Sequence, residues 1–330
     1  MCIRDSAATA RNLKEIAPTI YFNVPKGFEA LLPYLRDDEA LRKNFFSRLK
    51  VMFYAGAGLQ QFVWDELQQM SVATTGERII FLSSIGSTET APAALACTWD
   101  FSRPGNIGLP LAGVDLKLVP SEGKLEARLK GPNITPGYWR RPDLTADAFD
   151  DQGFYKIGDA LKFVDENDPG KGLLFDGRLA EDFKLASGTW VSAGALRGQF
   201  VDHCAPLVRD AVIAGPDRDD IAALVFPDIA ACGRLAGLPT DAKPADVLAN
   251  DKVRAEFQQR LTALAKQNAG SSTRICRAIL MDEPPSLDAG EATDKGSINQ
   301  RAVLGRRTAL VEELYAKPFS ARVISIEGRS

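Results

Sequence analysis

Two polar clusters in this chain contain residue types suited to binding a nucleotide. Ser87-Thr88-Glu89 follows an apolar run at residues 78–82 that predicts a buried strand. A carboxylate beside a hydroxyl suits a hard cation such as Mg²⁺ on a nucleotide phosphate; a solvated loop acid is the simpler alternative. Asp159 follows Gly158 at the end of another strand-like run, where its carboxylate could accept two hydrogen bonds from a ribose diol. An Asx turn is the alternative there.

Two further clusters are polar and turn-forming. Residues 177–191 contain Gly177-Arg178 and the loop Ser187-Gly188-Thr189, and residues 293–301 contain Lys295. A lysine in such a segment is ordinarily a solvated surface charge. Neither cluster indicates a function by itself, so both have to be interpreted together with the other motifs of the sequence.

The elements around the first cluster predict a layered α/β domain. Apolar residues recur at helical spacing through residues 27–50, and residues 51–55 form a buried strand that enters Gly56-Ala57-Gly58. A helix at 59–70 and the strand at 78–82 follow. Strand, helix and strand in succession predict a mostly parallel sheet. Such sheets bind ligands in loops beyond the carboxyl ends of their strands.

The pattern changes twice farther along the chain. From 105 to 176, glycine and proline separate short alternating runs, which predict the strands of a small barrel or an antiparallel sheet. Strand-like runs at 208–214, 221–226 and 274–281, with a helix at 251–268, predict a compact α+β domain. We therefore predict one domain over residues 7–176 and a second over residues 177–330.

Composition excludes several classes of protein. The 330 residues carry 40 Lys and Arg against 43 Asp and Glu, which argues against a broad nucleic-acid footprint. No apolar run reaches the length of a membrane-spanning helix, about 18 residues or more. The single histidine, His203, excludes a multi-histidine metal site and is best read as an ordinary helix or loop residue. Five cysteines are far apart and form no CxxC, so we predict neither a zinc site nor a disulfide framework, and a reducing cytoplasm: Cys2, Cys97, Cys204, Cys232 and Cys276.

Taken in order, the clusters resemble the C-terminal half of the AMP-forming acyl-CoA synthetases, members of the adenylate-forming superfamily. Within it the chain is most similar to the feruloyl-CoA synthases, on residues 180–184, 187–191 and 295–301. The resemblance covers nearly everything from residue 7 onward. Besides the clusters above, it rests on Tyr21-Phe22-Asn23-Val24-Pro25, Tyr54-Ala55-Gly56-Ala57-Gly58-Leu59, Gly131-Pro132-Asn133-Ile134-Thr135-Pro136-Gly137-Tyr138-Trp139 and Thr293-Asp294-Lys295-Gly296.

The resemblance implies a fold and a reaction. The fold is part of an adenylate-forming N-terminal domain, a parallel sheet plus a small β-barrel subdomain, followed by a small mobile α+β C-terminal domain. In the reaction, the carboxylate of a hydroxycinnamic acid such as ferulate joins the α-phosphate of ATP and pyrophosphate leaves. The C-terminal domain then rotates, and the CoA thiolate attacks the acyl-adenylate and releases AMP. ATP, Mg²⁺ and CoA are the implied cofactors and substrates.

The resemblance also implies roles for individual residues. Around the nucleotide it assigns Gly56, Ala57 and Gly58 to adenine, Thr88 to the α-phosphate, Glu89 to Mg²⁺, and Asp159 and Arg178 to the ribose. Around the acid it assigns Ile85 and Gly86 to the pocket wall, with Phe22 and Asn23 near the floor. Ser187, Gly188 and Thr189 would form a loop on the CoA side, and Lys295 is the candidate lysine for adenylate formation.

The chain departs from the family pattern at three places. The family's Ser/Thr/Gly-rich phosphate loop precedes the Asn-Val-Pro segment, and nothing in residues 1–20 matches it. The family's lysine directly follows a glycine, whereas Lys295 precedes Gly296. The hinge position two after Arg178 is Ala180, so the hinge lies at Glu181 or tolerates alanine.

Residues 1–6 resemble translated adapter sequence, so we predict a non-native leader on a fragment that is inactive alone and belongs to a complete synthetase. Two alternatives stay open: another aryl- or fatty-acyl-CoA ligase, and a non-catalytic module that binds a nucleotide or acyl-CoA. A NAD-dependent dehydrogenase is disfavoured because no GxGxxG follows a strand. The expected partners are small molecules, and the sequence leaves a homo-oligomer open.

Overall fold

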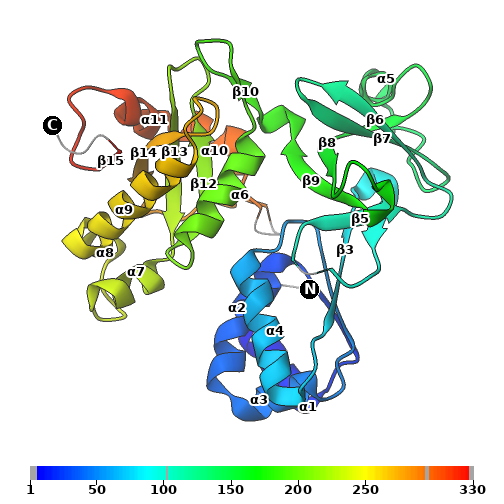
Figure 1. Cartoon of the computed structure of the whole chain (residues 1–330), viewed down its shortest axis with the longest axis horizontal. Coiled ribbons are helices and arrows are strands. Elements are labelled where there is room, and N and C mark those ends of the chain that lie inside the picture. Colours follow the sequence, from blue (N-terminus) through cyan, green and yellow to red (C-terminus); the bar gives the residue numbers. More distant parts are fainter. Residues whose placement is uncertain (1–5, 102, 294–296, 327–330) are drawn as a thin grey trace. The chain divides into compact units, whose positions relative to one another are not determined.

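The computed structural model describes residues 6–101, 103–293 and 297–326 (Figure 1). The chain divides into two compact units between Leu179 and Ala180. We predicted the boundary after residue 176. Strand β9 (Leu173–Arg178) pairs with β8 (Tyr155–Phe163), and this pairing keeps residues 177 and 178 in the first unit.

The first unit begins with a helix-rich part and continues as a series of strands. Its described elements before β8 are α1 (Ser6–Glu15), β1 (Ile20–Asn23), α2 (Pro25–Asp37), α3 (Glu39–Ser47), β2 (Val51–Ala55), α4 (Gln61–Thr75), β3 (Ile80–Ile85), η2 (Thr88–Thr90), β4 (Leu95–Cys97), β5 (Asn106–Pro110), β6 (Asp115–Ser121), β7 (Lys124–Lys130) and α5 (Pro142–Ala148). The strands form one sheet in the order β1-β2-β3-β4-β5-β9-β8-β7-β6.

Strands β1, β2 and β3 are parallel, as the strand–helix–strand pattern predicts. Helices α1–α4 cover one face of these strands, and the predicted apolar positions of the helices are buried in a common core with Tyr21, Met52 and Phe81. Pro25 opens α2 at a position where its missing N–H costs nothing. Asp38 caps α3 by accepting a hydrogen bond from the Leu41 amide. Local sequence signals thus set the helical layer.

The opposite face of the same three strands is apolar and open. Side chains alternate between the faces of a strand, and the face away from the helices carries Ile20, Phe22 and Ile80, which are 64%, 52% and 42% exposed. The Phe22 and Phe53 rings pack together there, with centroids 4.8 Å apart. Parallel strands are normally buried on both faces, whereas this face carries large apolar side chains that are exposed.

One predicted boundary in this sheet is wrong. The apolar run predicts that the strand ends at residue 82, but β3 continues through Ile85 and pairs with β4. Ser83 is buried in the strand, and its hydroxyl donates a hydrogen bond to the Asn106 carbonyl. A tertiary partner for the serine hydroxyl therefore outweighs the low strand preference of the segment.

The antiparallel half of the sheet corrects the predicted β-barrel subdomain. Strands β4 to β9 pair antiparallel with their neighbours, and they extend the parallel strands as one open sheet. In the described pairings β6 contacts β7 alone and forms an edge, so the strands do not close. The antiparallel alternative that the alternating runs left open is the one observed.

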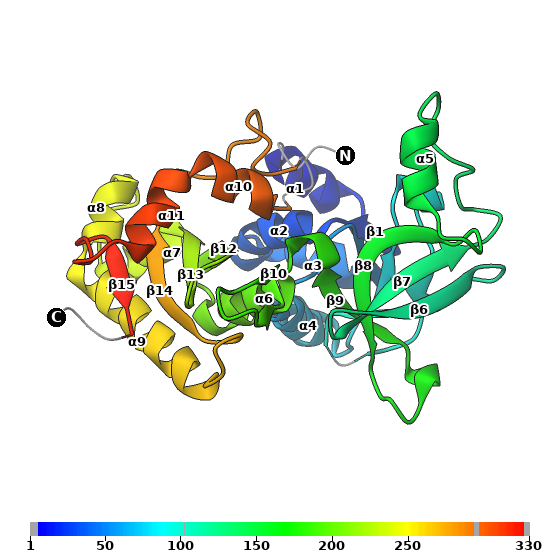
Figure 2. The ribbon, with the colours of Figure 1, turned by 90° about the horizontal axis from the view of Figure 1, so that it is seen from above.

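The second unit is an α/β sandwich with both faces of its sheet covered (Figure 2). In β13, Ile221, Ala223 and Val225 pack against α6–α9, whereas Ala222 and Leu224 pack on the side of α10 and α11. The described elements are β10 (Phe183–Lys184), β11 (Trp190–Val191), α6 (Ala193–Cys204), β12 (Val208–Ala214), β13 (Ile221–Pro227), α7 (Ile229–Ala236), α8 (Pro244–Ala249), α9 (Asp251–Gln267), β14 (Ile275–Leu280), α10 (Gln300–Arg306), α11 (Thr308–Tyr315) and β15 (Val323–Ser325).

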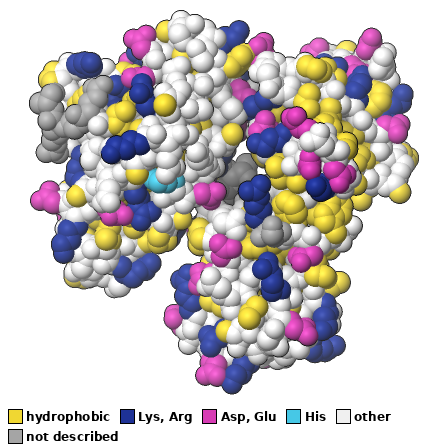
Figure 3. Space-filling view, viewed as in Figure 1, with side chains coloured by type: hydrophobic (Ala, Val, Ile, Leu, Met, Phe, Trp, Pro, Cys, Tyr) yellow, Lys and Arg dark blue, Asp and Glu magenta, His cyan; other side chains and the backbone are white. Residues whose placement is uncertain are grey.

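The surface charges, the cysteines, His203 and the helix lengths can be compared with what the sequence indicates. On the face shown in Figure 3, basic and acidic side chains are interspersed. Cys97, Cys204, Cys232 and Cys276 are buried free thiols. His203 lies in the last turn of α6, with its Nε2 3.1 Å from the Arg260 carbonyl oxygen. Among the described helices, none combines the length and the apolar character that crossing a bilayer requires.

Candidate active site

Two of the predicted nucleotide-binding segments, the Gly56-Ala57-Gly58 loop and the turn with Thr88 and Glu89, lie at the same end of the parallel strands. Strands β2 and β3 are adjacent and parallel, with Ala55 opposite Ser84. Gly56-Ala57-Gly58 follows the carboxyl end of β2, and the turn η2 with Thr88 and Glu89 follows the carboxyl end of β3. Loops at the carboxyl ends of parallel strands are where open α/β sheets bind ligands. The fold therefore brings these two clusters together.

Gly56, Gly58 and Gly86 differ in whether the fold itself requires a glycine at the position. Gly56 has a φ of +84°, a backbone conformation that favours glycine. Gly58 has an exposed backbone, and a Cβ built there meets nothing within 4 Å. Neither strain nor packing within the described chain explains the glycine at 58, and its open backbone leaves room for a ligand to approach. Gly86 is required by the fold, since a Cβ there would lie 1.9 Å from the Pro92 carbonyl oxygen.

Glu89 is held by contacts from outside its own turn. The Tyr138 hydroxyl donates a hydrogen bond of 3.0 Å to Glu89 Oε1, and the Thr135 amide donates one of 2.8 Å to the Glu89 carbonyl. The Ser87 hydroxyl, and less strongly the Tyr138 hydroxyl, lowers the pKa of the Glu89 carboxyl below its ordinary value. The side chain is half-buried and Thr88 is exposed. The carboxylate is thus charged and oriented at neutral pH.

This donor set fits Mg²⁺ that arrives with a nucleotide. The described residues contain no group of three or more His, Cys, Asp or Glu side chains able to hold a metal ion by themselves. Mg²⁺ keeps several waters and is commonly bound by one or two carboxylates plus substrate phosphates. One charged carboxylate beside the Thr88 hydroxyl matches that mode of binding.

Asp159 and Arg178 face each other across two strands of the antiparallel half. They are register partners in β8 and β9, and Arg178 Nε lies 3.5 Å from Asp159 Oδ1. Asp159 is buried, whereas the Arg178 side chain is 65% exposed. The strand is irregular at Asp159, and the preceding Gly158 has a φ of +80°. Such bulges re-aim side chains next to active sites.

The predicted acyl-pocket residues do not share one face of the sheet. Alternation along the strands places Asn23 and Ile85 on the helix-covered side and Phe22 on the open side. Asn23 Nδ2 donates to the Tyr21 hydroxyl at 2.9 Å, and its Oδ1 accepts from the Val24 amide. Phe22 packs against Phe53. The structure therefore groups Asn23 with Ile85 but not with Phe22.

The predicted CoA-side residues of the second unit lie in a hairpin. Ser187, Gly188 and Thr189 form the turn between β10 and β11, closed by a hydrogen bond from the Gly188 amide to the Leu185 carbonyl. Lys295 lies outside the described residues. The residues that flank it pair as a short antiparallel stem, with a bridge between Ala292 and Ile298.

Sequence reasoning missed two residues that organise these sites. Tyr138 was quoted only as part of a motif, although its hydroxyl contacts Glu89, 49 positions earlier. Glu291, two residues before Thr293, is fully buried and forms an ion pair with Arg307. No local pattern marks either contact, because both join segments that are separate in the sequence.

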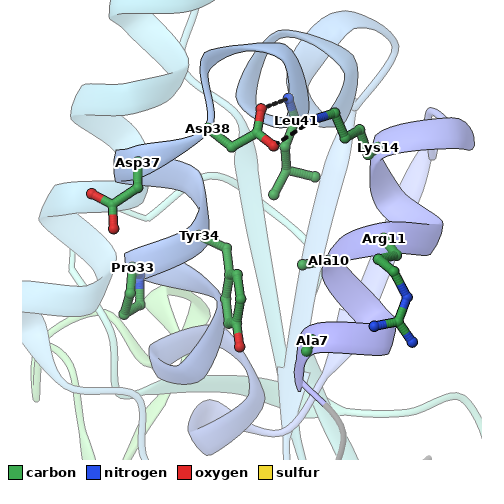
Figure 4. A pocket seen from close by; sticks show the side chains of 9 residues that line it. All are labelled: Ala7, Ala10, Arg11, Lys14, Pro33, Tyr34, Asp37, Asp38 and Leu41. Atoms are coloured by element: carbon green, nitrogen blue, oxygen red, sulfur yellow. Dashed lines mark hydrogen bonds and ion pairs between the residues drawn. The ribbon is translucent and has the colours of Figure 1, made fainter.

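A surface hollow lies away from all of these residues. It occupies about 430 Å³ between α1 and α2, with the Lys14–Asp38 ion pair at one end (Figure 4). Its lining includes Ala7, Arg11 and Tyr34 but none of the predicted site residues. It therefore does not enter the candidate site.

Two models of one family match the chain. The model described as AMP-binding enzyme matches residues 2–139, and the model described as AMP-binding enzyme C-terminal domain matches residues 183–318. A probable CoA ligase from Humulus lupulus is 29% identical over 64% of this chain and 34% of its own length. The 3-hydroxybenzoate–CoA ligase of Aromatoleum sp. (strain CIB) is 29% identical over 63% of this chain and 38% of its own length. The chain spans about a third of the length of these relatives.

Solved structures show the same fold. The A domain of carboxylic acid reductase from Segniliparus rugosus, in complex with AMP and a co-purified carboxylic acid, superposes with a TM-score of 0.70 and 21% identity. The match covers 95% of this chain and 49% of that one. The two family models between them match most of the sequence, and the fold agrees with that of the solved structures. The chain belongs to the AMP-binding enzyme family, the adenylate-forming enzymes that include the acyl-CoA ligases.

Proposed function

We propose that this chain is part of an ATP-dependent acid–thiol ligase that converts a hydroxycinnamic acid such as ferulate into its CoA thioester. The observation that carries the proposal is the parallel pairing of β2 and β3, which places the exposed Gly58 loop and the turn with the Glu89 carboxylate after the carboxyl ends of neighbouring strands. Backbone without a side chain lets the flat adenine ring of ATP approach closely. A charged carboxylate can hold the Mg²⁺ that accompanies the ATP phosphates.

In the first half-reaction, a carboxylate oxygen of the acid bonds to the α-phosphorus and the bond to pyrophosphate breaks. Thr88 would contact the α-phosphate, and Asp159, with Arg178 beside it, would hold the ribose diol. Glu89 would hold Mg²⁺, which when bound offsets the charge that accumulates on the phosphates. Each of these side chains acts by orienting ATP for in-line transfer.

In the second half-reaction, the CoA thiolate bonds to the acyl carbon and the bond to AMP breaks. We assign Ser187-Gly188-Thr189 to the CoA side of this step. The hairpin suits that role because the Ser187 and Gly188 positions are exposed and the turn is closed by its own backbone hydrogen bond. Lys295 is assigned to the first step alone.

The acyl pocket is proposed to use Ile85, Gly86 and Asn23. Ile85 and Asn23 lie on one side of the sheet, and Gly86 cannot carry a side chain without displacing Pro92. Phe22, on the other side, is instead assigned to the contact with a covering layer. An aromatic acid is favoured by residues 180–184, 187–191 and 295–301 and by the relative named for 3-hydroxybenzoate.

We further propose that activity needs a layer over the open face of β1–β3 and a loop that holds the phosphates. Both would be supplied by residues that are not among the 330 of this sequence. The bare apolar face supports the first requirement, since the second unit's sheet is covered on both sides. We call the protein that includes this layer and this loop the complete synthetase. Sequencing the locus upstream of Ala7 tests the idea: an open frame through a Ser/Thr/Gly-rich loop supports it, and a stop codon followed by a genuine start at Met1 favours the non-catalytic module.

The acid specificity is tested with a panel of ferulate, benzoate and octanoate, each with ATP, Mg²⁺ and CoA. We expect the complete synthetase to form thioester and AMP fastest with ferulate, because an aromatic slot gains from stacking and shape. Fastest turnover of octanoate would replace the feruloyl assignment by a fatty-acyl-CoA ligase. Binding of ATP without turnover of any of the acids would support a non-catalytic module.

Lys295→Ala is expected to lower ATP–pyrophosphate exchange about 10²-fold, the range for loss of one preorganised cationic or hydrogen-bonding group. Thioester formation from a preformed acyl-adenylate should change much less, because pyrophosphate has already left. Lys252→Ala, at the exposed start of α9, is the matched control. Equal losses in the two half-reactions would contradict the role, and unchanged exchange would move it to another lysine.

A further inference from the structure

The segment from Gly131 to Arg141 is pinned against the turn that carries Glu89. Asn133 Nδ2 donates hydrogen bonds of 2.9 Å to the carbonyls of both Thr90 and Ala93. The Thr135 amide donates to the Glu89 carbonyl at 2.8 Å. These hydrogen bonds hold the Gly131–Arg141 segment against residues 89–93, which include the candidate metal carboxylate Glu89.

Tyr138 is itself fixed by this segment. Its amide donates a 2.9 Å hydrogen bond to Thr145 Oγ1 in α5, and Gly137, with a φ of +144°, brings the backbone against Thr145. The phenol then reaches Glu89 Oε1 at 3.0 Å.

The Tyr138 contact adds a restraint from outside the turn to that of the Ser87 hydroxyl at the N-cap. Glu89 lies in η2, a three-residue turn, and its side chain has several rotatable bonds, so partners of the carboxylate decide its orientation. A hydrogen bond to one carboxylate oxygen fixes the plane of the group, and it directs the second oxygen. Partners of this kind around a metal carboxylate typically account for about 10- to 100-fold in metal affinity.

We propose that Tyr138 is a positioning residue, which orients the Glu89 carboxylate for the cation that accompanies ATP. The proposal rests on the proposed function, since it assumes that Glu89 holds Mg²⁺. It goes beyond that function by assigning the phenol of the Gly-Tyr-Trp segment to the metal carboxylate. The ring alone fills space, and the hydroxyl carries the effect.

The test compares ATP binding by the complete synthetase with and without Mg²⁺, measured by calorimetry. Tyr138→Phe keeps the ring and removes the hydroxyl. We expect it to weaken ATP binding about 10-fold in saturating Mg²⁺ and to leave binding in EDTA unchanged. Tyr34→Phe, which removes a partly exposed phenol from α2, is the matched control and should alter neither value.

A double-mutant cycle separates positioning from folding. In a Glu89→Gln background, Tyr138→Phe should cause no further loss in Mg²⁺, because the carboxylate it orients is gone. An equal loss with and without Mg²⁺, or additive losses in the cycle, would overturn the positioning role and leave the proposed function standing. If Glu89→Gln alone leaves the Mg²⁺ dependence unchanged, the assignment of Glu89 fails, and the role of Tyr138 fails with it.

Discussion

Glu89→Gln is expected to lower ATP–pyrophosphate exchange by the complete synthetase about 10³-fold, the upper range for loss of one preorganised electrostatic group. Glutamine keeps the size of the side chain, and its amide oxygen can still accept the hydrogen bond from Tyr138. The negative charge that a hard cation requires is what disappears. Thioester formation from a preformed adenylate should fall too, because the same carboxylate serves both half-reactions.

The control for this variant lies beyond the other end of β3. Glu77 is exposed just before β3, beyond the amino end of the strand, and Glu77→Gln removes an equal charge. We expect it to change exchange less than twofold, as for a solvated surface acid. The Mg²⁺ concentration for half-maximal rate should rise for Glu89→Gln alone. A fall in rate with an unchanged Mg²⁺ dependence would show that Glu89 acts in some way other than through the metal.

The features of the fold that sequence predicts well are those set by neighbours along the chain. The strands at 51–55 and 208–214 have the predicted bounds, because an apolar run ended by glycine is a local signal. The helix predicted at 251–268 is α9 to within one residue, with Asn250 as its N-cap. Hydrophobic periodicity and capping involve residues within one or two turns of each other, so the sequence alone contains these signals.

The features that sequence misses depend on distant partners. Ser83 lies in a strand because the Asn106 carbonyl, 23 positions later, accepts its hydroxyl. Whether β6 closes a barrel depends on which strand reaches its free edge, and alternation within β6 carries no information on that. The open face of β1–β3 also escaped prediction, because an apolar strand has the same sequence whether or not its second covering layer is present.

The candidate site divides in the same way. Residue types and order predict that Thr88 and Glu89 follow a strand, and parallel pairing of β2 and β3 places that turn and the Gly56-Ala57-Gly58 loop at the same end of the sheet. Asp159 was predicted at the end of a strand, but it lies inside β8 because its register partner in β9 continues the pairing. Tyr138 contacts Glu89, and no spacing rule connects the two. Alternation could have shown that Phe22 and Asn23 point to opposite faces, since they are consecutive residues of one predicted strand.

Glu291→Gln is expected to destabilise the second unit by about 3–5 kcal/mol at neutral pH, the cost of leaving one partner of a buried ion pair alone. Glu291 is fully buried, and Arg307 contacts both of its carboxylate oxygens at 2.8 Å. The Ser286 amide donates a further bond of 2.8 Å to Oε2. Among the described ion pairs Arg307 has no carboxylate partner but Glu291, so the amide removes the charge that it contacts directly and leaves only the weaker attraction of Glu283 and Asp282.

The pH dependence gives this prediction a second, independent signature. Arg307 lowers the pKa of the Glu291 carboxyl from an ordinary 4.5 to about 2 in the folded chain. The stabilisation is therefore fully present above about pH 5 and is lost as the pH falls from 4.5 towards 2, where the unfolded chain takes up the proton first. The difference between wild type and Glu291→Gln should shrink across this window.

Hydrogen exchange of β12–β14, with β7 and β8 of the first unit as an internal reference, measures the effect in the whole chain. Glu312→Gln removes an exposed partner of Arg218 and should cost less than about 1 kcal/mol. Because the Asn299 amide donates to the Glu291 carbonyl, exchange at the stem beside residues 294–296 should rise with that of the strands. Equal protection in the two variants at pH 7 would mean that the Glu291–Arg307 pair does not stabilise the unit, and a difference independent of pH would assign the loss to packing and not to charge.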